Sequence, residues 1–214
     1  MAAHGNPGIV TDGLVVCLDA GDKNSYPGSG ATWTDLSPNR SECTLYNSPT
    51  FSEDHFIFDG TNSVSIDEFQ TQTGVNQYTW NLWVKSPSSV TSYDMIMSTD
   101  YSYLYLAFYL SKITFDSNLT LTNRFFDYSA STWYHLVVCV DGVADTTKCY
   151  VNASEEHSDV AADTLDGHRL WVGKWYDGNH HLVNGNIGPV QIYNRALSTD
   201  EVLQNYNATK SRFV

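Results

Sequence analysis

The stretch of the chain best suited to bind a ligand is residues 174–181, where aromatic, carboxylate, amide and imidazole side chains follow one another. One side of a sugar ring is apolar and packs on a flat aromatic ring, while its hydroxyls pair with carboxylate, amide and imidazole groups. We therefore predict a glycan-binding loop made by Trp175, Tyr176, Asp177, Asn179, His180 and His181.

The same loop also has a purely structural interpretation. Trp175 could instead be a core residue or a contact between subunits. Adjacent histidines point in opposite directions on extended backbone, which weakens a joint metal-binding role for His180 and His181. If the loop does bind a glycan, the candidates for a second rim of the site are Tyr93, Asp94, Tyr101 and Tyr103.

Nucleophilic and thiol chemistry have little support in the sequence. There is no Gly-x-Ser-x-Gly elbow, and Ser29 lies in a turn rather than between a strand and a helix. The four cysteines contain no Cys-x-x-Cys pair that would indicate zinc or redox chemistry. Cys139 and Cys149 flank a turn at Asp141-Gly142, so they could face each other and form a disulfide, with free buried thiols as the alternative.

Composition and charge exclude several classes of protein. The chain has 214 residues, with 24 acidic and 11 basic side chains, a net charge of −13 and a pI near 4.6. Such a surface repels phosphate backbones and anionic headgroups, so we expect neither nucleic-acid binding nor membrane insertion. The longest apolar stretch, residues 103–110, is shorter than the roughly 20 residues of a membrane span. Residues 1–7 lack a signal-peptide pattern, so we expect synthesis in a cytoplasm.

The elements that must position these residues are mostly strands. Tyr, Trp, Phe and Thr are abundant, and these side chains favour pleated surfaces. Residues 23–49, rich in Pro and Gly, are predicted to form a long surface loop anchored by Trp33 and Leu36. Ser198 and Glu201 make a capping box that predicts a helix over 198–206. Apolar runs and alternation predict strands at 13–19, 56–58, 63–66, 78–85, 101–110, 133–140, 148–152, 169–173 and 188–193.

Many short strands at regular spacing indicate one sandwich domain. We assign residues 13–214 to this domain and residues 1–12 to an N-terminal arm, since no linker or repeat divides the chain. Helix 198–206, residues 210–214 and residues 1–9 are candidate contact elements between subunits. The tryptophans expected in the core are Trp33, Trp80, Trp83, Trp133 and Trp171.

Three blocks of sequence resemble concanavalin A-like, laminin-G-like jelly-roll domains, in the version found in structural proteins of tailed bacteriophages. The opening block comprises residues 13–20, 25–30, 32–37 and 58–60, and the middle block comprises 78–85, 133–138, 141–142 and 150–152. The closing block, from Gly185 through the Asn194-Arg195-Ala196-Leu197-Ser198 turn to Lys210, is the most specific. Together the blocks cover nearly the whole chain.

The resemblance implies an all-β fold, a two-sheet antiparallel jelly-roll sandwich with a short C-terminal helix. It also implies a non-enzymatic virion structural protein on the outside of a tailed phage, either a capsid decoration protein or a tail or fibre module, assembled in the host cytoplasm. Its partners would be other virion proteins, further copies of itself in a trimer, and host-surface glycans. Because this fold also hosts lectins and glycosidases, a carbohydrate-binding adhesin and a glycan-degrading enzyme stay open as alternatives.

The enzyme alternative requires a pair of carboxylates. Glycosidases hold two of them about 5 to 9 Å apart, and the jelly-roll glucanases carry a Glu-x-Asp-x-x-Glu type motif on one strand. The nearest clusters here are Asp67-Glu68 and Glu155-Glu156-x-x-Asp159, and neither has that spacing within an alternating strand. We therefore expect these acids to be solvated and the protein not to be an enzyme.

Calcium is the one cofactor that the resemblance brings in, because laminin-G-like domains often hold it with loop carboxylates and carbonyls. We expect that the protein does not require a cofactor. Calcium is nevertheless considered, because carboxylate and carbonyl oxygens are the hard ligands that it prefers. Asp59-Gly60 also fits a tight turn, and Asp19 fits a turn acid that accepts backbone N–H groups. The candidate ligands are Asp19, Asp22, Asp59 and Asn62.

Overall fold

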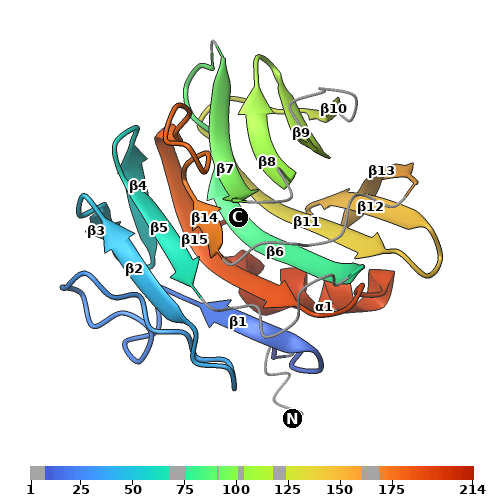
Figure 1. Cartoon of the computed structure of the whole chain (residues 1–214), viewed down its shortest axis with the longest axis horizontal. Coiled ribbons are helices and arrows are strands. Elements are labelled where there is room, and N and C mark those ends of the chain that lie inside the picture. The colour runs from blue at the N-terminus through green and yellow to red at the C-terminus, as the bar shows by residue number, and fades with distance from the viewer. Residues whose placement is uncertain (1–7, 68–75, 91, 101–103, 118–123, 161–168) are drawn as a thin grey trace.

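Two antiparallel β-sheets pack face to face, and a helix near the end of the chain lies against the outside of one of them (Figure 1). The structure is a computed structural model and describes residues 8–67, 76–90, 92–100, 104–117, 124–160 and 169–214. It confirms the predicted all-β sandwich with a short C-terminal helix. Within the described residues, no helix is both long enough and apolar enough to cross a membrane.

The first sheet has eight strands. Their order is β13 (Ser154–Asp159), β12 (Thr146–Val151), β11 (Trp133–Asp141), β6 (Gln77–Lys85), β15 (Val183–Tyr193), β4 (His55–Asp59) and β3 (Thr50–Ser52), and β1 (Leu14–Leu18) also pairs with β15. β15 changes register against β6 between Ile187 and Val190, so Gly188 and Pro189 lie in a bulge. A bulge tolerates proline because proline has no N–H for the ladder.

The second sheet has seven strands. Their order is β10 (Arg124–Asp127), β9 (Lys112–Ser117), β8 (Leu104–Tyr109), β7 (Tyr93–Thr99), β14 (Arg169–Val172), β5 (Ser63–Asp67) and β2 (Glu42–Tyr46). β2 corrects the prediction that residues 23–49 are all loop. Only Cys43 and Leu45 of this strand are buried, a pattern too short to stand out among the neighbouring turn residues. Trp33, the predicted anchor, is fully buried.

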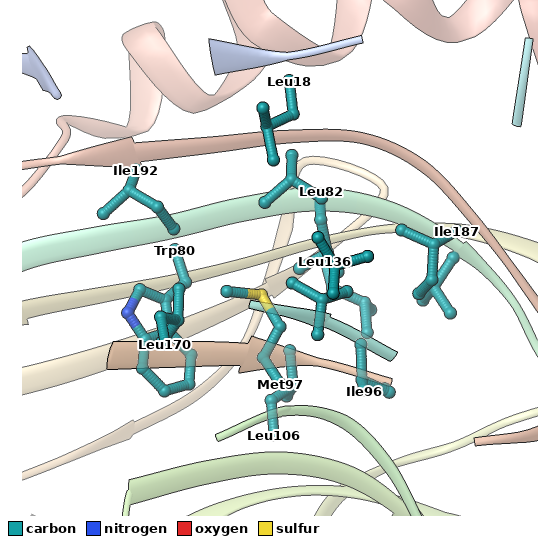
Figure 2. Close-up of a cluster of buried hydrophobic side chains, with 14 of the residues drawn as sticks. Leu18, Trp80, Leu82, Ile96, Met97, Leu106, Leu136, Leu170, Ile187 and Ile192 are labelled. Atoms are coloured by element: carbon teal, nitrogen blue, oxygen red, sulfur yellow. The ribbon is translucent and has the colours of Figure 1, made fainter. Parts of the chain in front are cut away.

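Alternate residues of the two sheets fill the space between them. Figure 2 shows side chains of the eight-stranded sheet, such as Leu82 and Ile192, meeting those of the seven-stranded sheet, such as Met97 and Leu170. Trp33 and Trp80 belong to this core, as predicted. Burial of this apolar surface is the main force that holds the sheets together.

Three other tryptophans predicted for the core lie elsewhere. Trp83 is buried on the outer face of the eight-stranded sheet, where its ring stacks on Phe213 at a centroid distance of 4.7 Å. Trp171 is buried on the outer face of the seven-stranded sheet, and Trp133 is only half-buried beside Phe213. Alternation places every second residue of a strand on the outer face, and a covering helix or side chain then buries it there.

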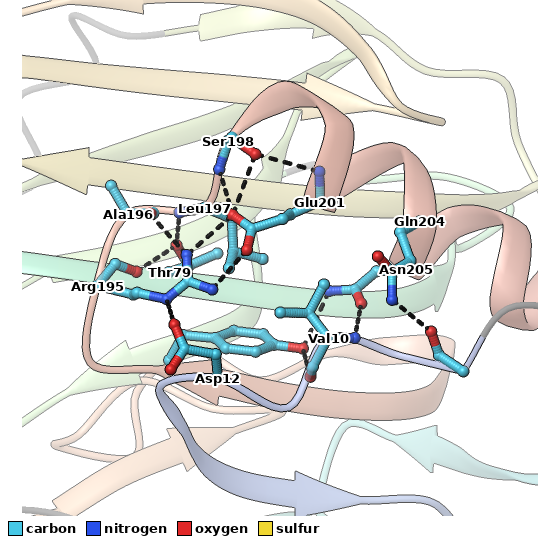
Figure 3. Close-up of polar contacts among 12 residues, drawn as sticks. Val10, Asp12, Thr79, Arg195, Ala196, Leu197, Ser198, Glu201, Gln204 and Asn205 are labelled. Carbon is cyan, nitrogen blue, oxygen red and sulfur yellow. Dashed lines mark hydrogen bonds and ion pairs between the residues drawn. The ribbon is translucent and has the colours of Figure 1, made fainter.

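Helix α1 (Thr199–Thr209) begins at the predicted capping box and continues into a 3-10 turn, η1 (Lys210–Arg212). Ser198 Oγ accepts the N–H of Glu201, and the Glu201 carboxylate accepts the N–H of Ser198. Arg195 donates to both oxygens of that carboxylate, at 2.9 and 2.6 Å (Figure 3). These bonds, led by the Arg195 contact, lower the pKa of Glu201 to about 2. The helix start is thereby tied to the turn after β15.

The chain before β1 is also tied to this helix. The N–H of Val10 donates to Asn205 Oδ1 at 2.8 Å, and the carbonyl of Val10 accepts the hydroxyl of Tyr193 at 3.0 Å (Figure 3). Gln204 donates to the carbonyl of Gly8 at 2.8 Å. Residues 8–12, which the sequence analysis assigned to an arm, thus pack on the domain, while residues 1–7 lie outside the described residues.

The disulfide considered between Cys139 and Cys149 is not present. In the β11–β12 hairpin Cys139 is opposite Lys148, and Cys149 is opposite Val138. The two thiols therefore point to opposite faces of the sheet, because an offset of one residue reverses the side of the strand. Cys149 packs in the core between the sheets and Cys139 packs near helix α1, and both are free.

Candidate functional site

The predicted glycan-binding loop follows β14 and folds over the outer face of the seven-stranded sheet. It starts at Gly173, whose φ of +81° belongs to the left-handed region. A Cβ on this residue would lie 2.4 Å from the ring of Phe58, so only glycine fits here without a shift. The N–H of Gly173 bonds to the carbonyl of Ile96 at 2.9 Å, and its carbonyl accepts the N–H of Leu182 at 2.8 Å.

Within the loop, the chain runs out and returns like a small hairpin. Lys174 and His181 form an isolated antiparallel bridge, and the N–H of Trp175 bonds to the carbonyl of His180 at 2.7 Å. Ser98 Oγ on β7 donates to the carbonyl of Lys174 at 2.9 Å. These bonds hold both limbs of the loop and fasten the first limb to the sheet.

Trp175 anchors the loop instead of presenting a free ring. Its side chain is only 4% exposed, and it packs with Met95 and Ala107 on the outer face of the sheet. Its ring meets the ring of Tyr105 edge-on at a centroid distance of 5.5 Å. The structure therefore corresponds to the core-type interpretation of Trp175, and leaves no open indole face for a sugar.

The neighbouring loop residues do face solvent. Asp177 and Asn179 are exposed, and Tyr176 and His180 are half-buried. Asp177 accepts the backbone N–H of Asn179 at 2.9 Å and its side-chain amide at 2.6 Å. The turn therefore holds a carboxylate, an amide, a phenol and an imidazole close together at the surface.

Tyr93, a predicted rim residue, lies beside this loop. Its ring meets that of His180 at 5.3 Å and that of Tyr109 at 4.6 Å. Asp94 is 7% exposed and alternates to the other side of β7, away from the loop. Tyr101 and Tyr103 lie outside the described residues.

Next to the loop lies a cluster that the sequence analysis did not identify. Trp171 is flanked by two cations: Arg169 Cζ lies 5.0 Å from its ring centroid, and Lys174 Nζ lies 3.6 Å from it. Burial, with a smaller contribution from Arg169, lowers the pKa of Lys174, and burial together with Lys174 lowers that of His181. The Arg169-x-Trp171 spacing could have predicted part of this cluster, because residues two apart on a strand lie on the same face.

The candidate calcium ligands are engaged within the protein. Both oxygens of Asp19 accept hydrogen bonds from Arg212, at 2.7 and 2.8 Å. Asp22 and Asp59 accept backbone N–H groups two residues further on, and Asn62 accepts the N–H of Asp59 at 2.9 Å. Among the described residues, no group of three or more His, Cys, Asp or Glu side chains could hold a metal ion. Asp19 lies beside Asp54, before the start of β4, whereas Asp59 ends that strand, so the structure does not bring the four candidates together. Calcium stays a prediction from the resemblance.

The carboxylate clusters weighed for catalysis are placed as follows. Asp67 forms an ion pair with Arg169, and Glu68 lies outside the described residues. Glu155 pairs with Lys148 at 3.0 Å on β13, at the edge of the eight-stranded sheet. Asp67 and Glu155 therefore lie on different sheets, each beside a cation, and Glu156 and Asp159 are exposed on β13.

A separate cavity of about 560 Å³ lies between the β11–β12 hairpin and the start of helix α1. The side chains of Cys139, Tyr150 and Leu197 in its lining are buried. The Tyr150 hydroxyl lies 3.2 Å from Thr199 Oγ1, and Lys148 is paired with a glutamate. Its main polar groups thus have partners within the protein.

Comparison with known proteins identifies the family. A family model described as the concanavalin A-like lectin/glucanases superfamily matches residues 58–203, more than half of the chain, so the protein belongs to this superfamily. No curated protein matched the sequence.

Solved structures of similar fold include domains that bind other molecules. Domain 4 of AbnA, a GH43 extracellular arabinanase from Geobacillus stearothermophilus solved in complex with arabinotriose, has a TM-score of 0.70 at 17% identity, over 92% of this chain and all 100% of that domain. The botulinum neurotoxin serotype D binding domain has a TM-score of 0.72 at 14% identity, over 94% of this chain and 53% of that one. Trypanosoma rangeli sialidase in complex with the inhibitor DANA has a TM-score of 0.74 at 13% identity, over 98% of this chain and 36% of that one.

The chain thus spans about half the length of the neurotoxin domain and about a third of the sialidase. At these identities the likeness shows the shared fold. Function must therefore be argued from the site itself.

Proposed function

We propose that this protein is a non-catalytic carbohydrate-binding domain, and that its glycan site is the 174–181 loop together with Tyr93. The observation that carries the proposal is the group formed by exposed Asp177 and Asn179 with half-buried Tyr176 and His180, on a loop fastened to a rigid sheet. Sites held by rigid elements lose little freedom when they bind.

The chemistry of these groups suits a sugar. Tyr93 and Tyr176 offer partly exposed rings for the apolar side of a pyranose or furanose. Asp177 and Asn179 offer hydrogen-bond acceptors and donors for vicinal hydroxyls. Trp175 supports the site from beneath, because its buried ring keeps the loop on the sheet.

Two further observations support this proposal. A domain of similar fold and comparable length, domain 4 of the arabinanase AbnA, was solved with arabinotriose. The non-catalytic part of the proposal is supported by the pairing of Asp67 with Arg169 and of Glu155 with Lys148, on different sheets.

The test is a broad glycan array followed by calorimetry with the best ligand. We expect saturable binding that weakens about tenfold or more in Tyr176→Ala and in Asp177→Ala, since each removes a stacking ring or a charged hydrogen-bond partner. Leu203→Ala is the control: Leu203 is 45% exposed on helix α1, on the opposite side of the sandwich. Absence of binding to every glycan, or binding that neither loop variant weakens, would contradict the proposal.

We also propose that the domain acts on the outside of a tailed-phage virion, as a decoration, tail or fibre module. This setting is supported by the resemblance of the opening and closing blocks of the sequence to such proteins. Light scattering of the purified chain, with and without a calcium chelator, tests it, and we expect a stable trimer. A clean monomer in both conditions would argue against an assembled virion part.

A further inference from the structure

We infer that the glycan bound at the 174–181 loop is acidic, and that the carboxylate of a uronic or sialic acid type sugar pairs with Lys174. This inference rests on the proposed carbohydrate-binding function and specifies its ligand class.

The first argument is the pairing of the cations. The protein carries 24 acidic and 11 basic side chains, so a cation has many carboxylates within reach. Lysines and arginines that pair with them include Lys112, Lys148, Arg169, Arg195 and Arg212. Several cations, Lys174 among them, make no ion pair with the part of the chain that the structure describes; Lys23, Arg124 and Lys210 are exposed, whereas Lys174 is half-buried.

The second argument is the position of Lys174. Its backbone is fixed by the bond from Ser98 Oγ and by the bridge to His181. Its Nζ lies 3.6 Å from the centroid of the Trp171 ring, so the ring attracts the ammonium from one side. A ring face accepts no conventional hydrogen bond, so the N–H donors of the ammonium that do not face the ring stay available to an anion.

The third argument is the charge around Lys174. Arg169 also lies over the Trp171 ring, and burial together with the Arg169 charge disfavours the charged form of Lys174. Lys174 and His180 in turn disfavour the charged form of His181. Asp177 is the acid that favours the charged Lys174, but its two oxygens already accept bonds from Asn179. A bound anion would therefore supply a charge partner that Lys174 lacks among the described residues.

The fourth argument concerns the kind of anion. A lysine ammonium acts as a point charge that pairs with a single anionic oxygen, whereas bidentate pairs with a carboxylate or a phosphate favour the arginine fork. Arg169 is already occupied by Asp67. The adjacent Tyr176 and the loop's carboxylate and amide supply contacts for a sugar ring and its hydroxyls, which a simple anion would not use.

The test compares an oligogalacturonate with its methyl ester, which removes the charge and leaves the hydroxyls unchanged. We expect the purified protein to bind the acid about ten- to hundredfold more tightly than the ester, as for one charge-assisted hydrogen bond. Lys174→Gln should abolish that preference by weakening binding of the acid to about the affinity of the ester. Sialyllactose against lactose serves as a second pair.

Lys210→Gln is the matched control, because Lys210 Nζ also lies over an aromatic ring, that of Tyr206, at 5.3 Å on the helix side of the molecule. It removes the same charge and should preserve the preference. Equal binding of acid and ester, an unchanged preference in Lys174→Gln, or equal binding of a sulfated neutral oligosaccharide would overturn the inference while the glycan site stands. Failure to bind any glycan would instead refute the proposed function.

Discussion

At the scale of single residues, His135 is the most unusual group in the protein. Its imidazole is fully buried on β11 between the rings of Trp83 and Tyr206, at 5.3 and 5.7 Å. Neither ring nitrogen has a hydrogen-bond partner among the described residues. Burial therefore lowers the pKa of His135 to about 3, and the ring is neutral at ordinary pH.

This burial predicts a loss of stability in mild acid. The unfolded chain binds the proton at a higher pH than the folded chain, so stability is complete above pH 6.5 and falls as the pH drops toward 3. The loss should reach about 2 kcal/mol between pH 8 and pH 5. Urea denaturation at these two pH values measures it.

The His135→Leu variant, which keeps an apolar side chain of similar size, should lose this pH dependence. The pKa of Glu201 is lowered in the folded protein, so its effect on the free energy of unfolding changes only below its ordinary pKa of 4.5. Glu201 therefore does not contribute to the change between pH 8 and pH 5. His181 does act there, and His181→Gln is the control for its smaller share. A free energy of unfolding that changes equally with pH in wild type and His135→Leu would contradict this account.

At the scale of elements, the 174–181 loop depends on the glycine that precedes it. Gly173→Ala should destabilise the protein by about 3 kcal/mol, from backbone strain at positive φ and from contact with the Phe58 ring. Gly178→Ala is the matched control: its φ is +79°, but nothing lies within 4 Å of a Cβ there, so only the strain of about 1 kcal/mol applies.

Denaturation curves followed by tryptophan fluorescence measure both variants. Equal destabilisation by the two substitutions would show that the close approach of Phe58 to Gly173 has no energetic role.

Several elements could be predicted because their signals are local. Strong alternation over Tyr78–Lys85 indicated β6, and the spacing of Ser198 and Glu201 indicated the start of helix α1. The chemical character of the 174–181 loop was likewise visible from its residue types. These features depend on period and capping, which a single segment carries by itself.

Other features depend on contacts between distant segments. The register of β11 against β12 separates Cys139 from Cys149, and no local pattern sets that register. The burial of Trp175 requires Tyr105, about 70 residues earlier in the chain, to lie beneath it. The partly exposed Lys174 and Arg169 around Trp171 become a cluster only when the loop folds back on the sheet.

At the scale of the whole molecule, stability comes from the core between two sheets without cross-links. All four cysteines are free and buried, and burial raises the pKa of Cys17 to about 12 and that of Cys139 to about 11. Thiols in this state react slowly, since the thiolate is the reactive form.

Thiol chemistry therefore provides a check on the whole fold. We expect no labelling of the native protein by a thiol reagent, four labels after denaturation, and a Tm that a reducing agent does not change. Mass spectrometry counts the labels. Rapid labelling of the native protein, or a Tm lowered by reductant, would contradict the packing of β1, β2, β11 and β12, which carry the four cysteines.

The fold itself is shared with lectins and with parts of enzymes, so the function of this member of the superfamily depends on its surface. Two surfaces compete as ligand sites: the 174–181 loop on the seven-stranded sheet, and the cavity between the β11–β12 hairpin and helix α1. The two surfaces lie on opposite sides of the sandwich. An experiment that locates the bound ligand therefore shows which of them is the binding site.

The most direct measurement is therefore an NMR titration of isotope-labelled protein with the best glycan from the array, read as amide shifts along the chain. The account predicts that the largest shifts occur at Tyr93, Lys174 and residues 176–181. Shifts centred instead on Cys139, Tyr150 and Thr199, or the absence of shifts with every glycan, would contradict the claim that this loop is a carbohydrate-binding site.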